Sequence, residues 1–529
     1  ACFSFFPRTL NNTTPDEERL VCTASRNRTP QFKLLEPANM TGALELARNG
    51  LVLGVLYIIG HVMYNAFLHP LRKYPGPLSH RMSVLPRSWY QLRGLLPFHM
   101  VELHKQYGPV VRVAPNELAF SGLQAWRDIY GHKKAGEEEF PKYDGVYKIF
   151  DWLPTSVINA NRQDHGMLRR QLSHGFSERS MREQEPIIGS YANLLIKRLR
   201  EGVKTNTAQN LREWYNYATF DIIGDLSFGV DGGFGCLQNS DYHPWVTLIG
   251  KAIYQGAIIQ GLIRLGLRRP IGWISRSALL ADNENRAIVY EKVGQRMEGG
   301  ERPDFLEGLL RKKEELKLDQ GSLTMNAVLL IIAGSETTAT LLSGATWLLT
   351  SHPEILKKLE QEVRSAFKSD DEITLTSVGN LTYMLACLNE SLRRYPPVAG
   401  SLPRVAPKGG AMVDGGFVPE GTIVSLYQWA VNHDKNYWND PYSFAPERWL
   451  GDPKYKSDKL DAMQSFSVGP RNCIGRNLAY AEMRLILAKI VYNFDMTLAD
   501  DSRDWLDGQR AFVIWEKPAL NVHLKPVAH

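Results

Sequence analysis

FSVGPRNCIGRNLAY (466–480) is the stretch that decides how this chain folds. It places Cys473 between Gly469 and Gly475, with Arg471 two residues before it and an apolar run at helical spacing after it. A cysteine thiolate near neutral pH needs a positive environment. The cysteine is expected just before a helix N-terminus, where the helix dipole and free N–H groups stabilise negative charge. The pattern therefore predicts a thiolate that binds a large, flat ligand.

A haem meets each need of this loop. The glycines permit a tight turn and the close approach of a bulky ligand. Arg471 can pair with a carboxylate of that ligand. Haem offers an iron for the thiolate of Cys473, two propionates for arginines, and a flat face against which Phe466 and Gly475 can pack. The alternative is a buried cysteine in a glycine-rich turn.

Composition narrows the classes of protein. The chain has 529 residues, 44% of them hydrophobic, and a formal net charge of +6, which gives no support to nucleic-acid binding. No linker is visible beyond residue 70. The cysteines are Cys2, Cys22, Cys236, Cys387 and Cys473. Their odd number and the lack of a CxxC pair argue against a disulfide framework or a zinc site, and favour a reduced, cytosol-facing protein.

An apolar run near the N-terminus predicts a membrane anchor over residues 49–69. LVLGVLYIIGHVMYNAFL (51–68) has 18 residues without a formal charge, which is just long enough to span a bilayer. Arg72 and Lys73 follow it, and this asymmetry of basic residues puts the C-terminal side in the cytosol. A buried core helix is the alternative.

The first 48 residues are polar, and we expect them to be disordered. They carry N-x-S/T sequons, which are glycosylation acceptors if the segment is luminal. The sequons are Asn11, Asn12, Asn27 and Asn39.

Beyond residue 70 the sequence predicts a mainly α fold with a minor β portion. Helical periodicity and proline stops predict helices over 162–176, 218–229, 322–353, 353–367 and 381–397. Alternation and glycine turns predict strands within 410–427 and a final hairpin-like pair within 512–524.

AGSETT (333–338) interrupts the most apolar of these helices with an acid. A charge at Glu336 is costly there unless it has a task or a partner, and a buried salt bridge is the plain alternative. Thr337 can hydrogen-bond a helix carbonyl or a ligand. In the helix over 381–397, Glu390 and Arg393 share one face and can pair.

FSVGPRNCIG resembles the haem-binding signature of the cytochrome P450 superfamily, Phe-x-x-Gly-x-Arg-x-Cys-x-Gly, at every defined position. Further motifs of this family follow in order over about residues 70–525. The resemblance implies the cytochrome P450 fold for residues 70–529 and haem b with Cys473 as the axial iron ligand. It also implies that Glu336 and Thr337 manage protons during oxygen activation.

The same resemblance assigns further residues. It implies a structural network of Glu390, Arg393 and Arg448 that fixes the segment before the cysteine loop. It implies propionate partners at His165, Arg169, Arg404 and Arg471. We expect apolar pocket residues at Ile332, Ala333, Val398, Ala399 and Phe512.

The implied function is a haem-thiolate monooxygenase in the endoplasmic reticulum membrane, single-pass, with a cytosolic catalytic domain. No dinucleotide fingerprint is present and only 56 residues follow Cys473, so electrons must come from NADPH–cytochrome P450 reductase, with cytochrome b5 as a second donor. Arg170, Arg476 and Arg484 are candidate docking residues.

The segment FLHPLRKYPGP after the apolar run and the C-terminal segment FVIWEKPAL resemble fungal members of the family that oxidise polyketide or terpenoid intermediates of secondary metabolism, mycotoxins included. Two alternatives stay open. One is an O2-independent haem-thiolate isomerase or dehydratase, against which AGSETT argues. The other is a non-enzymatic haem sensor.

Overall fold

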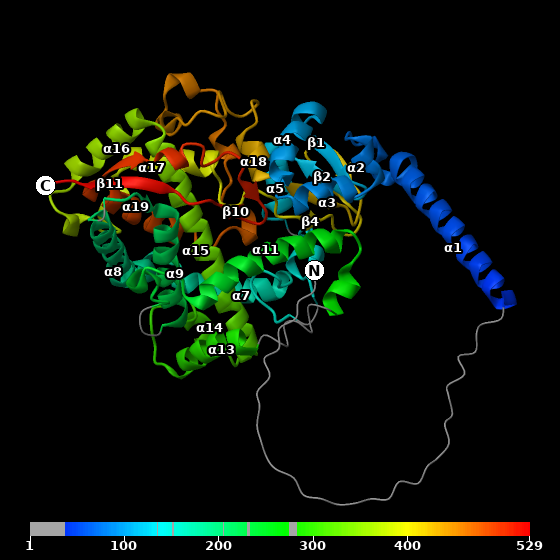
Figure 1. Ribbon diagram of the computed structural model, residues 1–529, viewed down its shortest axis with the longest axis horizontal. Helices are drawn as coiled ribbons and strands as arrows, with labels where there is room; N and C mark the ends of the chain where they lie inside the picture. Colours follow the sequence, from blue (N-terminus) through cyan, green and yellow to red (C-terminus); the bar gives the residue numbers. More distant parts are fainter. Residues whose placement is uncertain are drawn as a thin grey trace, which may run out of the picture. The chain divides into compact units, whose positions relative to one another are not determined.

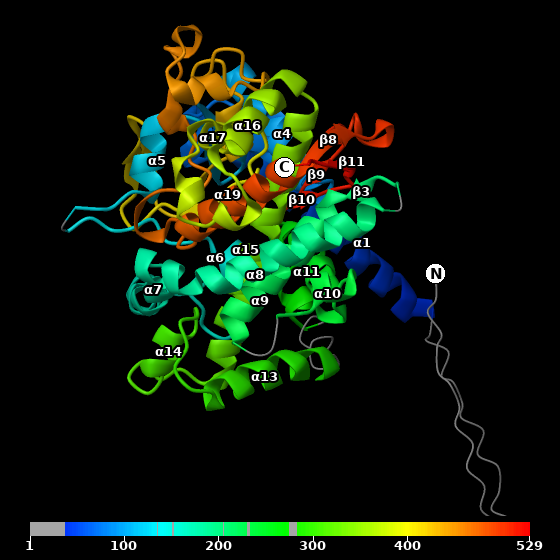
Figure 2. The same ribbon diagram turned by 90° about the vertical axis from the view of Figure 1, so that its left-hand side faces the viewer.

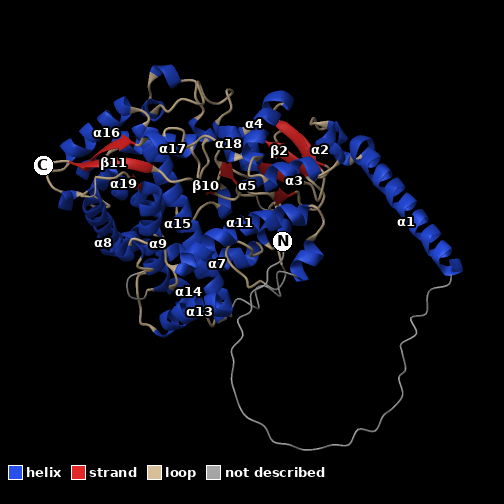
Figure 3. Ribbon diagram, viewed as in Figure 1, coloured by secondary structure: helices blue, strands red, loops and turns tan. Residues whose placement is uncertain are grey.

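The structure, a computed structural model, describes residues 37–134, 136–150, 153–204, 206–229, 233–273 and 283–528. The chain forms two compact units, residues 1–60 and 61–529. Helices make up most of the second unit, and its strands form small sheets between them (Figures 1 and 3). This confirms the predicted mainly α fold with a minor β portion.

The helices of the second unit are α2 (Leu78–Met82), α3 (Leu85–Leu92), α4 (Leu96–Tyr107), α5 (Leu123–Tyr130), α6 (Asp144–Tyr147), α7 (Arg162–Gly175), α8 (Glu178–Val203), α9 (Leu211–Phe228), α10 (Cys236–Asn239), α11 (Pro244–Arg264), α13 (Asn283–Glu298), α14 (Glu307–Arg311), α15 (Gln320–Thr350), α16 (Pro353–Ala366), α17 (Thr382–Arg394), α18 (Gln428–Asn432) and α19 (Arg476–Asn493). The strands are β1 (Val110–Ala114), β2 (Glu117–Phe120), β3 (Gln209–Asn210), β4 (Arg404–Val405), β5 (Ala411–Val413), β6 (Gly416–Val418), β7 (Ile423–Leu426), β8 (Phe494–Leu498), β9 (Arg510–Ala511), β10 (Trp515–Glu516) and β11 (Asn521–Pro526).

The N-terminal helix α1 spans Pro37–Met63 and continues as a π-helix over Tyr64–Leu68. Its apolar stretch Leu44–Leu68 has 25 residues and a mean hydropathy of 1.8, and is long and apolar enough to cross a membrane. Side chains along this stretch are exposed, Leu51 to 70%. By composition alone α11 and α15 also qualify, but 61% of the apolar window of α15 is buried.

The start of α1 corrects one expectation. Residues 37–48, expected in the disordered segment, are helical, and Asn39 lies in the first turn. Residues 1–36, with the sequons Asn11, Asn12 and Asn27, lie outside the described residues. At the other end Asn65, a polar interruption of the predicted anchor, is buried and donates to the carbonyl of Met82 at 3.2 Å.

The two largest sheets of the domain have four and three strands. The strand order β1-β2-β7-β4 forms the larger one, in which β2 and β7 run parallel and the other pairs antiparallel. A second sheet has the order β3-β11-β8, and these strands lie together at one edge in Figure 2. The predicted terminal hairpin is wrong, because β10 pairs with β9 while β11 pairs with β8 and β3. Pro518 lies between β10 and β11 and has no N–H to donate, so it favours separation of the two strands.

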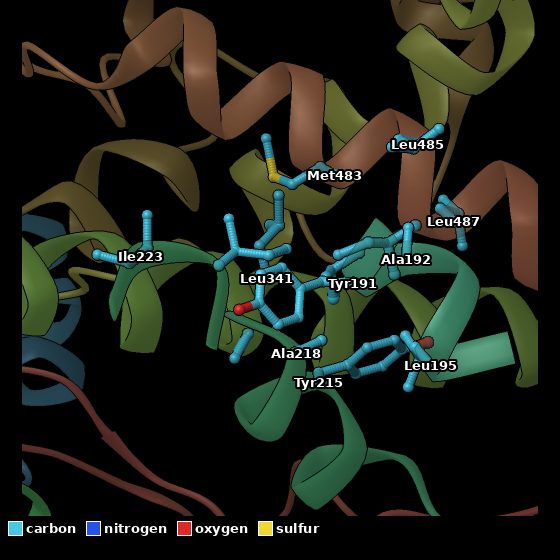
Figure 4. Packing of buried hydrophobic residues seen from close by; sticks show 14 of the residues in the cluster. Tyr191, Ala192, Leu195, Tyr215, Ala218, Ile223, Leu341, Met483, Leu485 and Leu487 are labelled. Carbon is cyan, nitrogen blue, oxygen red and sulfur yellow. The ribbon is translucent and has the colours of Figure 1, made fainter. Parts of the chain in front are cut away.

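The core is centred on α15, as predicted for the apolar stretch. Figure 4 shows Leu341 of α15 among side chains of α8, α9 and α19, such as Tyr191, Ala218 and Met483. The packing is close: a Cβ at Gly344 would lie 2.2 Å from the ring of Tyr395. The centre of the domain is therefore a set of helices whose relative positions have little freedom.

A fully buried charge network joins α17 to the segment that leads to the cysteine loop. The carboxylate of Glu390 accepts from Arg393 at 2.7 and 2.9 Å and from Nε of Arg448 at 3.1 Å, and all three side chains are fully buried. Arg393 also donates to the carbonyls of Pro441 and Ser443. The structure thus brings together the three residues that the family resemblance grouped.

We expect Arg393→Ala to destabilise the domain by about 3–5 kcal/mol, because it leaves the carboxylate of Glu390 buried without the two hydrogen bonds that Arg393 donates. The measurement is the urea midpoint of unfolding for the full chain in detergent. Arg179→Ala is the control, since Arg179 forms an exposed pair with Glu183 on α8 and its loss should cost about 0.3–0.5 kcal/mol. Equal midpoints for the two variants would contradict a structural role of the network.

Candidate functional site

The loop that carries Cys473 is fixed by its own backbone. Gly469 has a φ of +76°, and a Cβ there would lie 1.9 Å from the carbonyl oxygen of Tyr130, so only glycine fits. The N–H of Cys473 donates to the carbonyl of Phe466 at 2.9 Å. Gly475 differs, because a Cβ there would meet only the ring of Phe176 at 3.7 Å, an ordinary contact. The protein alone therefore requires Gly469 but leaves space beside Gly475.

Cys473 opens into a largely apolar cavity of about 260 Å³. Among the described cysteines, Cys236 and Cys387 are buried and Cys473 is accessible. The walls combine parts of α15, the segment before β4 and the cysteine loop. Lining residues include Ala333, Thr337, Thr338, Leu341, Val398, Leu402, Phe466 and Met483.

The groups around Cys473 act on its thiol in opposite directions. Desolvation within the cavity raises the pKa of the thiol, and the N–H of Gly475 and the guanidinium groups of Arg169 and Arg476 oppose this rise. The positive environment that the sequence pattern predicted is therefore present around the sulfur. A bound metal cation would complete it, because a coordinating thiol is deprotonated outright.

Glu336 and Thr337 face different spaces. Thr337 lines the Cys473 cavity and its hydroxyl donates to the carbonyl of Ala333 at 2.6 Å. Glu336 lines a second cavity of about 400 Å³ and pairs with the ammonium of Lys517 at 2.9 Å, which also donates to Thr340 at 2.6 Å. The acid therefore has the buried salt-bridge partner that the sequence left open as an alternative.

The predicted propionate partners divide into two groups. Arg404 and Arg471 line the Cys473 cavity. His165 and Arg169 line a neighbouring hollow, and Arg169 donates to the backbone carbonyl of Asn472 at 2.7 Å and to its side chain at 2.5 Å. Arg169 therefore holds the cysteine loop. Burial and nearby arginines lower the pKa of His165 to about 3, so this imidazole is neutral.

Three residues that the sequence analysis missed also belong to this region. Lys142 and Tyr147 line the Cys473 cavity, and Glu139 pairs with Arg471 and lies 3.8 Å from Arg404. All three lie in the short segment EEEFPKYDGVY (137–147), which ends in α6 and in which no spacing distinguishes them from solvated polar residues. Burial, together with Arg404 and Arg471, lowers the pKa of Lys142 to about 6.

This arrangement fits a haem. The guanidinium groups of Arg404 and Arg471 and the amine of Lys142 lie near one another at the wall of an apolar cavity, and Nε of Arg404 is buried without a hydrogen-bond partner in the part of the chain that is described. A ligand with two carboxylates would relieve that excess. Among the described residues no group of three or more His, Cys, Asp or Glu side chains could hold a metal ion, so an iron here needs the porphyrin nitrogens beside the single sulfur.

The expected pocket residues are only partly brought together. Ala333 and Val398 line the Cys473 cavity, whereas Phe512 lines the second cavity beside Glu336. Ile332 and Ala399 line neither of these two cavities.

Of the candidate docking arginines, Arg476 and Arg484 share one surface hollow; Arg170 lines the hollow of His165 instead. Arg170 and Arg476 are exposed, and Arg484 is half-buried.

Comparisons with known proteins agree with this site. The family model described as Cytochrome P450 matches residues 75–521. The chain is 48% identical to cytochrome P450 monooxygenase tpeC of Talaromyces stipitatus over 507 residues, which cover 94% of this chain and 98% of the relative. It is 44% identical to cytochrome P450 monooxygenase 1 of Neocamarosporium betae (89% and 96% covered) and 43% identical to trichothecene C-15 hydroxylase of Fusarium sporotrichioides (89% and 96%). The chain therefore belongs to the cytochrome P450 family and is a cytochrome P450 monooxygenase.

Proposed function

We propose that this monooxygenase inserts one O2-derived oxygen atom into an apolar small molecule, by hydroxylation, epoxidation or desaturation. The observation that carries the proposal is the accessible sulfur of Cys473 in an apolar cavity that Arg404, Arg471 and Lys142 also line. Haem b, when bound, supplies the iron at which dioxygen is reduced, and a thiolate ligand favours cleavage of the O–O bond.

The residues of the chain bind and orient that cofactor. Cys473 would bind the iron, and Phe466 and the space beside Gly475 would accommodate the porphyrin. Arg404 and Arg471 would pair with the propionates, and we add Lys142 to that set. His165 and Arg169 act from behind the loop, since Arg169 fixes Asn472 next to the ligand.

We assign proton transfer to Thr337, which lines the Cys473 cavity, and to its neighbour Glu336, which lines the second cavity. A hydroxyl has one proton and two lone pairs, so Thr337 accepts a hydrogen bond from the cavity while it donates to Ala333. Glu336, held by Lys517, connects the same helix turn to the second cavity. A positioned acid of this kind typically contributes about 10²-fold or more to a rate.

The substrate that we propose is a polyketide or terpenoid intermediate of fungal secondary metabolism. The cavity walls near Cys473 are mostly apolar, with Val398, Leu402 and Leu341 among them. A relative at 43% identity is named trichothecene C-15 hydroxylase, which supports hydroxylation of a carbon skeleton.

We also propose the endoplasmic reticulum membrane as the location, with Leu44–Leu68 as a single span and the catalytic domain in the cytosol. NADPH–cytochrome P450 reductase is the proposed electron donor and cytochrome b5 a second one. Arg476 and Arg484 follow Cys473 on α19 and line one hollow, whose other charged residues are Arg182, Glu178, Glu185 and Asp461, and we propose that the two arginines pair with acidic groups of the partner.

The first test is the reduced carbon-monoxide difference spectrum of the purified holoprotein. We expect the band of thiolate-ligated haem in the wild type and its complete loss in Cys473→Ser, because a serine oxygen does not replace the thiolate. Cys387→Ala, which changes a cysteine buried in the core, should keep the band. A histidine-type spectrum in the wild type would refute the proposed ligand.

The second test addresses the electron donor. We expect Arg170→Glu with Arg484→Glu to lower reductase-dependent NADPH consumption about tenfold at low salt, with unchanged haem content, because charge complementarity sets the association rate. Arg476 is left intact, since it also acts on the pKa of Cys473. Arg179→Glu, an exposed site on α8, is the matched control, and an equal effect there would contradict a specific docking face.

A further inference from the structure

The second cavity, which Glu336 lines, has walls that the oxidation chemistry leaves without a role. It has a volume of about 400 Å³ and is lined by parts of α9, α11 and α15, which lie next to one another in Figures 1 and 2, and by the segment around β10. One wall is apolar: the rings of Tyr254 on α11 and Phe512 meet edge to face, with centroids 4.9 Å apart. Ile514 and Trp515 continue this wall. The cavity can therefore hold the apolar body of a small molecule.

The wall that α9 contributes carries two hydrogen-bonding atoms that are not used. Arg212 and Asn216 are four residues apart, so they share one face of this helix. Asn216 is 3% exposed and its amide nitrogen donates to the hydroxyl of Tyr242 at 2.9 Å, but its Oδ1 is buried without a partner among the described residues. Nε of Arg212 is likewise buried and unpaired within that part of the chain. A free acceptor and a free donor thus occur together, although buried polar groups are normally paired.

The charges of the cavity favour an anionic ligand. Apart from the ion pair of Glu336 already described, the charged lining residues are Arg212, Lys251 and Glu516. Arg212 lies 3.8 Å from the carboxylate of its neighbour Glu213, which is a long contact for an ion pair. Lys251 is exposed and forms no ion pair with any residue that the structure describes. A carboxylate of a ligand would give these two cations a counter-ion.

We propose that the second cavity binds a small apolar molecule that carries a carboxylate and a hydroxyl group on the same ring, as hydroxy-substituted aromatic acids do. The carboxylate accepts from Arg212 and attracts Lys251, the hydroxyl donates to Oδ1 of Asn216, and the ring packs against Tyr254 and Phe512. No residue lines both this cavity and the Cys473 cavity. Such a site goes beyond the proposed function, because it needs neither haem nor oxidation of its ligand.

The spacing of the two polar side chains selects the probe. Neighbours four residues apart on a helix face have Cβ atoms about 5–6 Å apart, which suits a carboxylate and a hydroxyl in meta positions. The probe is therefore 4-hydroxy-2-naphthoate, in which the two groups are too far apart to bond to each other. Its binding is measured by calorimetry with the full-length holoprotein in lipid nanodiscs, and empty nanodiscs serve as the blank.

Variants of the α9 wall test the two contacts. We expect Arg212→Met to weaken binding of the probe about tenfold, because a charge-assisted hydrogen bond is lost, and Asn216→Ala to weaken it about fivefold, because a neutral one is lost. Arg179→Met removes an exposed arginine of α8 and should leave the affinity unchanged. A wild type that does not bind the probe, or equal affinity in the Arg212→Met variant, overturns the proposal.

Two simpler probes assign each contact even if the Asn216→Ala variant does not fold. 2-Naphthoate lacks the hydroxyl group and should bind the wild type about fivefold more weakly than the hydroxy acid. 1-Naphthol lacks the carboxylate, so it should bind about tenfold more weakly and should not respond to Arg212→Met. Equal affinities of the wild type for 2-naphthoate and the hydroxy acid would show that the hydroxyl is not recognised, and the proposal would be wrong.

The haem spectrum distinguishes the two cavities. A probe in the second cavity should leave the Soret band of the holoprotein unshifted and should still bind when imidazole occupies the iron. A shifted band, or competition with imidazole, would place the probe in the Cys473 cavity and overturn the second site. A wild type without the thiolate-haem spectrum would instead refute the proposed function and leave the second site intact, since the two cavities share no lining residue.

Discussion

The sulfur of Cys473 lies where its charged form is unfavourable until a cation binds to it. Burial raises the pKa of the thiol, and the helix N-terminus with Arg169 and Arg476 offsets only part of that cost. What the chain supplies is position: Gly469 fits under the carbonyl of Tyr130, and Arg169 holds Asn472. The loop therefore holds the sulfur in a fixed position, and a bound metal cation would stabilise the negative charge of the thiolate.

The same logic applies to the basic residues of this cavity. Arg404, Arg471 and Lys142 lie near one another at its wall, and Glu139 is the acid that pairs with Arg471 and lies near Arg404. Buried cations that outnumber their counter-ions are costly, and burial together with Arg404 and Arg471 lowers the pKa of Lys142. A dianionic ligand would balance the charge, so thiol and cations are two unfavourable features that one haem would relieve together.

The sequence predicted the parts of this site that are contiguous. The cysteine loop and the apolar helix α15 follow from residues within one turn or one helix, because local spacing determines them. Contacts between distant segments were predicted only where the family resemblance named them, as for Glu390 and Arg448. Lys517, the partner of Glu336, is 181 residues away in sequence, and Lys142 reaches the cavity from a loop without periodicity. The prediction of a terminal hairpin is wrong for the same reason, because β11 pairs with β8 and β3.

The hydrogen bond of Thr337 limits how protons can enter the Cys473 cavity. Its only proton is directed at the carbonyl of Ala333, so the hydroxyl can accept from the cavity but cannot donate into it without rotating. Glu336 is held toward the second cavity by Lys517 and does not line the Cys473 cavity. A proton that reaches the Cys473 cavity from this turn of α15 therefore requires a reoriented Thr337.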